Sequence, residues 1–201
     1  LHDACTSGYV DAEVVCLLTD RKAAAVRERA RRAGVEDVYV LQKDKTPEER
    51  DELVLAELRP RKIDLVCNAG YMRIHGAAFC KEFEGRSMNI HPALLPAFPG
   101  PHPIEDAWEW GVKTSGVTVH LSTDDLDMGP IIVQRAVDVA PGDTLESFEE
   151  KIHLAEYALY PKAVKLFAEG CLRVEGRRVI VERDVPDPPW SGDLPPGLKG
   201  S

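Results

Sequence analysis

The sequence of 201 residues predicts an α/β fold: a Rossmann-like, mostly parallel sheet with helices on both faces and a C-terminal antiparallel extension. Near-continuous apolar runs alternate with helical patterns along the first half, and strands that are covered on both faces have such runs. Two later segments, 115–123 and 130–139, show partial period-two alternation, which favours antiparallel pairing. Residues 144–169 carry the clearest helical periodicity, with apolar side chains at three- and four-residue steps.

The first half of the chain is predicted to alternate between helices and strands. In order, the elements are a helix at 1–8, a strand at 12–19, a helix at 22–33, a strand at 37–42, a helix at 47–59, a strand at 63–70 and a strand at 87–91. Thr46 is a good N-cap and Pro47 suits the first helical position, whereas Pro60 ends that helix. The last strand stops at His91 because Pro92 has no N–H for the ladder.

The long helix of the second half has recognisable ends. Asp143 and Glu146 resemble a capping box at its start, and Gly170 closes its end. Pro161 lies inside the pattern. Because proline lacks the N–H that an interior position needs, we expect Pro161 to kink the helix or divide it into two.

The remaining residues predict a hairpin and a tail. The hairpin at 171–182 should turn at Gly176, and residues 1–185 are expected to form a single domain. The proline-rich residues 186–201 read as an irregular tail. Since a doubly wound sheet normally opens on a central strand and a tight turn, about 12–20 residues of strand and turn are expected upstream of Leu1.

Composition excludes several classes of function. The formal net charge of -9 argues against binding nucleic acid through bulk charge. No apolar run is long enough to cross a bilayer, and no signal-peptide pattern opens the chain. The five cysteines are scattered without the spacing of a zinc site, so we expect no metal and a reducing cytoplasm. The expected partners are small molecules, with no nucleic acid and no membrane.

Asn89 and His91 are the first candidates for chemistry. Ligands of open α/β sheets bind beyond the carboxyl ends of strands, where Pro92 holds His91 extended. Asn89 lies two residues earlier, so both side chains leave the same side of the strand, and an amide beside an imidazole can donate to one developing oxyanion. The acidic loop at 124–127 offers a carboxylate partner. Two other interpretations of this loop are a solvated turn and a calcium site, although the loop lacks the ligand order of an EF-hand.

Other polar residues allow two interpretations. His153 and Glu156 share a helix face, where they bind a ligand amine or hydroxyl or form an exposed polar stripe. His120 lies in an alternating strand and is expected to be structural. The patterns of other enzyme classes, GxSxG, HExxH and Walker A, do not occur in the sequence.

Four stretches resemble the formyltransferase family that uses 10-formyltetrahydrofolate. They are NAGYMRI, MNIHPALLPAFPG, GVTVHLSTDDLDMGPII and AEYALYP, and the likeness runs from residue 1 to about residue 170. The chain is most similar to the branch that formylates the amine of glycinamide ribonucleotide in de novo purine biosynthesis. The resemblance implies a one-carbon formyl transferase with 10-formyltetrahydrofolate as cosubstrate and no metal. It leaves a homodimer open.

The resemblance also assigns roles to residues. Its implied catalytic residues are Asn89, His91 and Asp127. The amide and imidazole would stabilise the oxyanion of a tetrahedral intermediate, while the carboxylate would raise the pKa of the imidazole and position a water that relays the proton. Its implied cofactor-binding residues are Met72, Arg73, Ile74, His75, Asn89, Thr123, Asp124, Asp125, Leu126 and Asp127. Its implied substrate-binding residues are Arg86, His153 and Glu156, and the family's phosphate-binding turn would lie upstream of Leu1.

Three alternatives stay open. Formyltetrahydrofolate deformylase usually carries a double-His form of the central motif, whereas this chain has His91 followed by Pro92. Methionyl-tRNA formyltransferase is longer and has a basic C-terminal domain, unlike this acidic chain. A folate- or nucleotide-binding module without catalysis would fit a missing phosphate turn but would not explain Asn89, His91 and Asp127 together.

Overall fold

A computed structural model describes residues 1–190 of the chain. Its helices are α1 (His2–Thr6), α2 (Ala25–Arg32), α3 (Pro47–Leu58), η1 (Arg59–Arg61), α4 (Ala77–Glu82), α5 (Pro103–Trp110) and α6 (Leu145–Ala168). Its strands are β1 (Cys16–Thr19), β2 (Glu36–Tyr39), β3 (Val66–Asn68), β4 (Ser87–His91), β5 (Thr114–Leu121), β6 (Ile131–Asp138), β7 (Leu172–Glu175) and β8 (Arg178–Val181). None of the helices in this described part is long and apolar enough to cross a membrane.

The strands form a two-stranded and a six-stranded sheet. β1 and β2 pair in parallel, and so do β3 and β4. β4 then pairs antiparallel with β5, and β5 antiparallel with β6. The β7–β8 hairpin completes the order β3-β4-β5-β6-β8-β7. The predicted Rossmann-like α/β fold with an antiparallel C-terminal extension is therefore confirmed.

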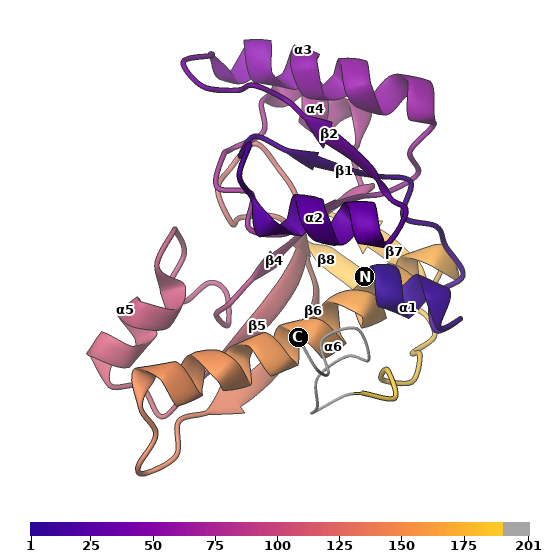
Figure 1. The fold of residues 1–201 in the computed structure, drawn as a ribbon. Coiled ribbons are helices and arrows are strands. Elements are labelled where there is room, and N and C mark those ends of the chain that lie inside the picture. The colour runs from indigo at the N-terminus through magenta and orange to yellow at the C-terminus, as the bar shows by residue number, and fades with distance from the viewer. Residues whose placement is uncertain (191–201) are drawn as a thin grey trace.

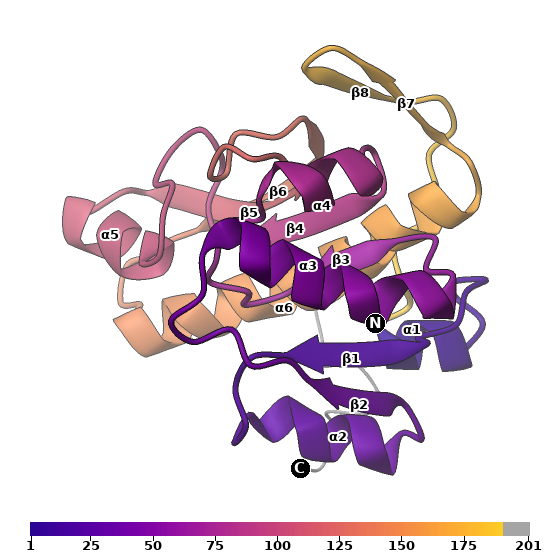
Figure 2. The ribbon, with the colours of Figure 1, turned by 90° about the horizontal axis from the view of Figure 1, so that it is seen from above.

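Helices cover both faces of the sheets (Figures 1 and 2), with α3 and α4 on one side and α6 on the other. On the α3 side, buried residues of the two helices form a cluster that includes Leu55 and Phe79. Leu18 of β1 and Val66 of β3 both pack against this cluster. The two sheets therefore share one helical layer, although no hydrogen-bonded ladder joins β1 to β3 within residues 1–190.

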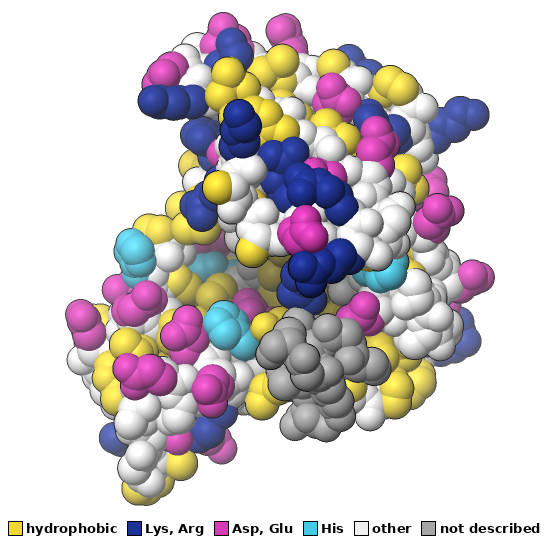
Figure 3. Space-filling view, in the orientation of Figure 1, with side chains coloured by type: hydrophobic (Ala, Val, Ile, Leu, Met, Phe, Trp, Pro, Cys, Tyr) yellow, Lys and Arg dark blue, Asp and Glu magenta, His cyan; other side chains and the backbone are white. Residues whose placement is uncertain are grey.

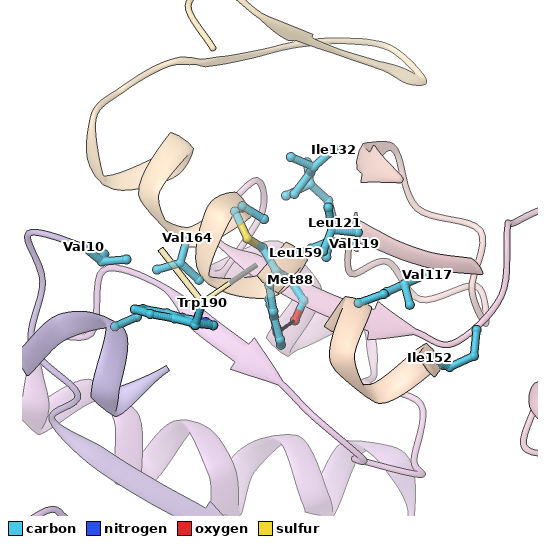
Figure 4. Close-up of a cluster of buried hydrophobic side chains, with 14 of the residues drawn as sticks. Val10, Met88, Val117, Val119, Leu121, Ile132, Ile152, Leu159, Val164 and Trp190 are labelled. Atoms are coloured by element: carbon cyan, nitrogen blue, oxygen red, sulfur yellow. Dashed lines mark hydrogen bonds between the residues drawn. The ribbon is translucent and has the colours of Figure 1, made fainter. Parts of the chain in front are cut away.

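The larger core lies between α6 and the strands β4, β5 and β6 (Figure 4). Met88, Val117 and Val119 are fully buried on the strand side, and Ile152 is fully buried on the helix side. Alternation along β4 sends Met88 and Ile90 into this core. Because successive strand residues point to opposite faces, Asn89 and His91 lie on the other face of the sheet.

The start of α3 agrees with the sequence. The Thr46 hydroxyl accepts the N–H of Glu49 at 3.2 Å, and the Glu49 carboxylate accepts the N–H of Thr46 at 2.8 Å. Pro47 occupies the first helical position, where its missing N–H costs nothing. The predicted N-cap is confirmed.

The cap of α6 differs from the expected one. Thr144 is the N-cap and forms a reciprocal capping box with Ser147, whereas the sequence analysis assigned this role to Asp143 and Glu146. The Asp143 carboxylate is already engaged, because it accepts from the Ala140 N–H at 2.6 Å and pairs with Lys151 at 2.5 Å. Neighbouring Asp and Thr both favour caps, and the tertiary partner decides between them.

Pro161 does not divide α6, which was one of the two outcomes expected from the sequence. The helix is continuous from Leu145 to Ala168. Proline cannot donate to the carbonyl four residues before it, which is that of Tyr157, but the indole N–H of Trp190 donates to this carbonyl at 3.1 Å. A buried carbonyl that keeps a partner avoids its desolvation cost, so the helix continues through Pro161.

Residues 186–190 contain no helix or strand, in keeping with the irregular tail expected from residue 186 on, but they pack against the domain. The Tyr9 hydroxyl donates to the Pro186 carbonyl at 2.6 Å, and the rings of Tyr9 and Trp190 meet edge to face with centroids 5.7 Å apart. Val185 and Trp190 are buried. Residues 183–190 thus link the loop after α1, which contains Tyr9, to α6, and residues 191–201 of the predicted tail lie outside the described residues.

Candidate active site

Asn89 and His91 share one face of β4, as the sequence predicted. On the opposite face of the strand, Met88 and Ile90 pack into the core between α6 and the sheet. The antiparallel register places His120 of β5 directly opposite Asn89, and His91 and His120 are only 4% and 3% exposed. An amide and two imidazoles are therefore gathered in one protected place.

Asp127 reaches this group from the loop between β5 and β6. One carboxylate oxygen, Oδ2, accepts the Gly100 N–H at 3.0 Å and lies 3.5 Å from His91 Nδ1. The other oxygen, Oδ1, lies 3.8 Å from His120 Nε2. The Asp127 side chain is 6% exposed, and its φ of 53° is in the left-handed region that Asp tolerates better than most residues. The loop thus delivers a buried negative charge to the two imidazoles.

The proline-rich loop fixes the protonation of His91. His91 Nε2 lies 2.8 Å from the carbonyl oxygen of Phe98. A carbonyl only accepts, so Nε2 carries a hydrogen and donates it to Phe98. The other ring nitrogen, Nδ1, therefore faces Asp127, and it is the nitrogen available for chemistry. The same loop supplies the Gly100 N–H that holds Asp127.

The segment Met72–His75 presents two exposed apolar side chains. Met72 is 58% and Ile74 is 46% exposed, while the Arg73 guanidinium pairs with Asp20 at 2.7 Å. His75 points inward instead. Its ring stacks on Phe79 with centroids 3.7 Å apart, and burial lowers the pKa of His75 to about 4.

The loop at 123–128 presents two more exposed apolar side chains, Leu126 at 51% and Met128 at 48%. Asp124 and Asp125 are exposed, and the Thr123 hydroxyl donates to the Asp125 carbonyl at 3.1 Å. No three His, Cys, Asp or Glu side chains in the described part of the chain are arranged to hold a metal ion.

The three residues assigned to substrate binding do not lie together. His153 and Glu156 share one face of α6, with Nδ1 2.9 Å from the Glu156 carboxylate, and this hydrogen bond raises the pKa of His153. Arg86 precedes β4, at the end of the strand opposite to His91. Its guanidinium donates to the carbonyls of Ile63, Asp64 and Glu82. The Arg86 guanidinium is thus engaged with backbone carbonyls at the end of β4 away from His91.

His120 was not identified as a candidate from the sequence. The alternation along its strand predicts which residues share a face of the sheet, but it does not predict which residues of the neighbouring strand lie opposite them. Only the pairing of β5 with β4 places His120 beside Asn89.

Figure 3 shows a hollow between the surface formed by α2 and that formed by α5 and α6, with hydrophobic and His side chains at its floor and rim. The site thus combines a buried polar group with apolar surroundings, an arrangement suited to stabilising charge on a reacting oxygen.

Comparisons with known proteins agree with this fold. A family model described as formyl transferase matches residues 1–164. A solved glycinamide ribonucleotide transformylase from Symbiobacterium toebii superposes with a TM-score of 0.87 and 43% identity, covering 90% of this chain and 86% of that one. A formyltetrahydrofolate deformylase from Pseudomonas syringae gives a TM-score of 0.81 at 26% identity and is covered to 60%. By their names, both of these α/β proteins act on formyl groups, and together with the family model they define the class of protein.

Sequence relatives point the same way. The phosphoribosylglycinamide formyltransferase of Mycobacterium tuberculosis is 40% identical over 186 residues, which is 92% of this chain and 86% of that protein. The trifunctional purine biosynthetic protein adenosine-3 of Drosophila pseudoobscura is 40% identical over 165 residues, but the chain spans only 12% of its length. The chain belongs to the formyl transferase family.

Proposed function

We propose that this chain transfers the formyl group of 10-formyltetrahydrofolate to the primary amine of glycinamide ribonucleotide, a step of purine biosynthesis. The observation that carries the proposal is the convergence of Asn89, His91 and Asp127, with 3.5 Å between His91 Nδ1 and Asp127 Oδ2. The family match and the names of the relatives support the substrates.

The proposed chemistry follows from the hydrogen-bonding state of His91. The amine attacks the formyl carbon, a new C–N bond forms, and the carbonyl oxygen becomes negative. Asn89 donates one amide hydrogen to that oxygen. Since Nε2–H is bound to Phe98, His91 can donate from Nδ1 only when the ring is doubly protonated. The Asp127 carboxylate, 3.5 Å from Nδ1, is placed to pair with the ring in that state.

Asp127 has a second proposed role after the attack. The amine nitrogen must lose a proton, and the leaving nitrogen of the folate must gain one when the old C–N bond breaks. A buried carboxylate beside the reacting centre can hold a water that relays this proton. No covalent bond to the protein is needed, so Asn89, His91 and Asp127 act only by donating, orienting and passing protons.

The two loops fit a flat, partly apolar cosubstrate. Met72, Ile74, Leu126 and Met128 are each close to half exposed or more, although side chains of this kind are usually buried. We propose that Met72–His75 and Thr123–Asp127 bind the folate and that Asn89, beside the second loop, contacts it as well. The formylfolate supplies the formyl group, and the folate nitrogen that carried this group is the leaving group. His75 would contribute through its backbone, because its ring stacks on Phe79.

His153 and Glu156 are the proposed contacts for the ribonucleotide. The carboxylate accepts hydroxyl or amine hydrogens, and the imidazole, whose pKa is raised, can carry a positive charge toward an anionic substrate. Arg86 is not included, because its guanidinium is committed to three backbone carbonyls at the far end of β4.

A coupled assay tests the proposal. Purified protein is incubated with glycinamide ribonucleotide and 10-formyltetrahydrofolate, and both tetrahydrofolate and formylated product are quantified. Transfer is expected for the wild type, and a loss of at least about a hundredfold for His91→Ala. His2→Ala, which changes a partly exposed histidine of α1, is the matched control and should keep wild-type turnover. Release of formate without formylated product would instead identify a deformylase, and binding of formylfolate without turnover would identify a binding module.

A further inference from the structure

His120 contacts the proposed site from β5, yet the proposed chemistry gives it no task. It lies opposite Asn89 in the antiparallel register and is 3% exposed. Its Nδ1 lies 2.9 Å from the Leu121 carbonyl oxygen, and its Nε2 lies 3.3 Å from Asn89 Nδ2. A buried histidine that touches a catalytic amide calls for an account of its hydrogen bonds.

The Leu121 contact settles which ring nitrogen carries the hydrogen. A carbonyl oxygen accepts only, so Nδ1 is the donor, and in the neutral ring Nε2 must then be an acceptor. Burial lowers the pKa of His120, which favours the neutral ring. Two other titratable groups face the ring and act in opposite directions: the Asp127 carboxylate, 3.8 Å from Nε2, raises the pKa of His120, and His91 lowers it. The hydrogen bond to Leu121 also raises the pKa, but burial is the largest effect.

The end of the loop 122–130 holds this ring in place. Gly129 lies against β5 so closely that a Cβ atom there would come within 1.6 Å of the Leu121 oxygen and 3.2 Å of His120 Nδ1. No residue with a side chain fits at that position without moving the backbone. The loop that carries Asp127 therefore closes over the His120–Leu121 hydrogen bond and shields it.

We infer that His120 is a positioning residue for Asn89: its Nε2 accepts one amide hydrogen, which fixes the orientation of the amide and turns the other hydrogen toward the reacting oxygen. The inference rests on the proposed function. An asparagine amide can turn by 180° at little cost, and in the wrong orientation its oxygen would face the developing negative charge. A neutral acceptor at Nε2 excludes that orientation, because two acceptors cannot share a hydrogen bond.

Two substitutions separate the two contacts of the ring. His120→Gln puts an amide near the position of Nε2, so it keeps an acceptor for Asn89 and loses the donor to Leu121. His120→Asn puts an amide near the position of Nδ1, so it keeps the donor to Leu121 and loses the acceptor for Asn89. Thermal unfolding of both variants first shows that each is folded.

Formyl-transfer kinetics give the first readout. His120→Asn is expected to lower kcat about tenfold, the effect of one neutral hydrogen bond, with KM for both substrates unchanged, because Asn89 acts on the reacting oxygen. His120→Gln should lose less than about threefold. In an Asn89→Ala background the two variants should be equally active, since there is no amide left to orient. Equal losses in both single variants, or a full loss that persists without Asn89, would overturn the inference.

NMR of the side-chain amides gives a readout that does not need turnover. The Asn89 resonances are identified by their absence in Asn89→Ala. One of the two amide hydrogens should exchange slowly with solvent in the wild type and in His120→Gln, and rapidly in His120→Asn. If the wild type shows this pattern but makes no formylated ribonucleotide, the proposed function fails while the contact stands. If neither hydrogen is protected in the wild type, the positioning role is wrong.

Discussion

Replacing Asp127 by Asn tests the electrostatic part of the proposed chemistry. Asn keeps the shape and an acceptor for the Gly100 N–H, so the loop should stay in place while the negative charge is removed. The Coulomb attraction between charges 3.5 Å apart is about 5 kcal/mol at an effective dielectric constant of about 20. Desolvation of the two groups offsets part of this. We therefore expect the substitution to raise the activation barrier by roughly 3 kcal/mol, which lowers kcat about a hundredfold.

The measurement is a single-turnover formyl-transfer assay of Asp127→Asn, so that product release does not mask the chemical step. Asp11→Asn, which makes the same change at an exposed residue, is the control and should turn over like the wild type. Unfolding of the variant should stay within about 1 kcal/mol of wild type, as for other substitutions that keep shape and hydrogen bonds. A loss of less than about fivefold in a folded Asp127→Asn protein would refute the argument that this carboxylate stabilises a charged His91.

Three further predictions concern stability. Trp190→Phe should destabilise the domain by about 1–3 kcal/mol, because the Tyr157 carbonyl loses its donor. The loss of stability should be smaller in a Pro161→Ala background, where residue 161 regains an N–H. Urea unfolding followed by circular dichroism measures both free energies. Thr46→Ala should cost about 1 kcal/mol through loss of the cap, seen as a fall of about 2–4 °C in Tm. Stability should also fall as the pH drops from about 6.5 to 4, because the unfolded chain protonates His75 while the folded chain, with a pKa of about 4 at this residue, does not; the contribution is about 3 kcal/mol.

Each of these predictions has its own control. The coupling between positions 190 and 161 contradicts the carbonyl argument if it is below about 0.3 kcal/mol, the usual limit of additivity. Glu52→Gln, an exposed residue of the same helix, should leave Tm almost unchanged when compared with Thr46→Ala. His75→Gln should flatten the pH dependence between 6.5 and 4, whereas His2→Ala should not. An unchanged slope in His75→Gln would show that carboxylates, not this imidazole, cause the loss.

Local chemistry explains what could be predicted of the fold. Thr46 and Pro47 define the start of α3 through contacts within one turn, and Pro92 ends β4 by lacking a donor. The outcome at Pro161 could not be predicted, because the group that satisfies the Tyr157 carbonyl comes from Trp190, which lies 33 residues away. The helices α4 and α5 were missed for a related reason: at 6 and 8 residues, they are too short for a periodic signal and depend on packing for their stability.

The candidate site divides in the same way. Asn89 and His91 follow from alternation along a single strand, which the sequence contains in full. His120 depends on the register of β4 with β5, which places it opposite Asn89. A shift of one residue would turn this ring to the opposite face, so no local pattern could have placed it. The position of Arg86 shows the converse: it directly precedes β4 in the sequence, but its guanidinium bonds backbone carbonyls at the end of the strand away from His91.

The contact between His91 and Phe98 links the shape of a loop to the location of a proton. While the Phe98 carbonyl holds the hydrogen on Nε2, a neutral His91 can offer only a lone pair at Nδ1. If a ligand displaced this peptide group, the ring would be free to change tautomer and present N–H at Nδ1 without gaining charge. Substrate-driven movement of the prolyl segment and the acid–base state of the imidazole are therefore thermodynamically coupled, and a change in either one shifts the other.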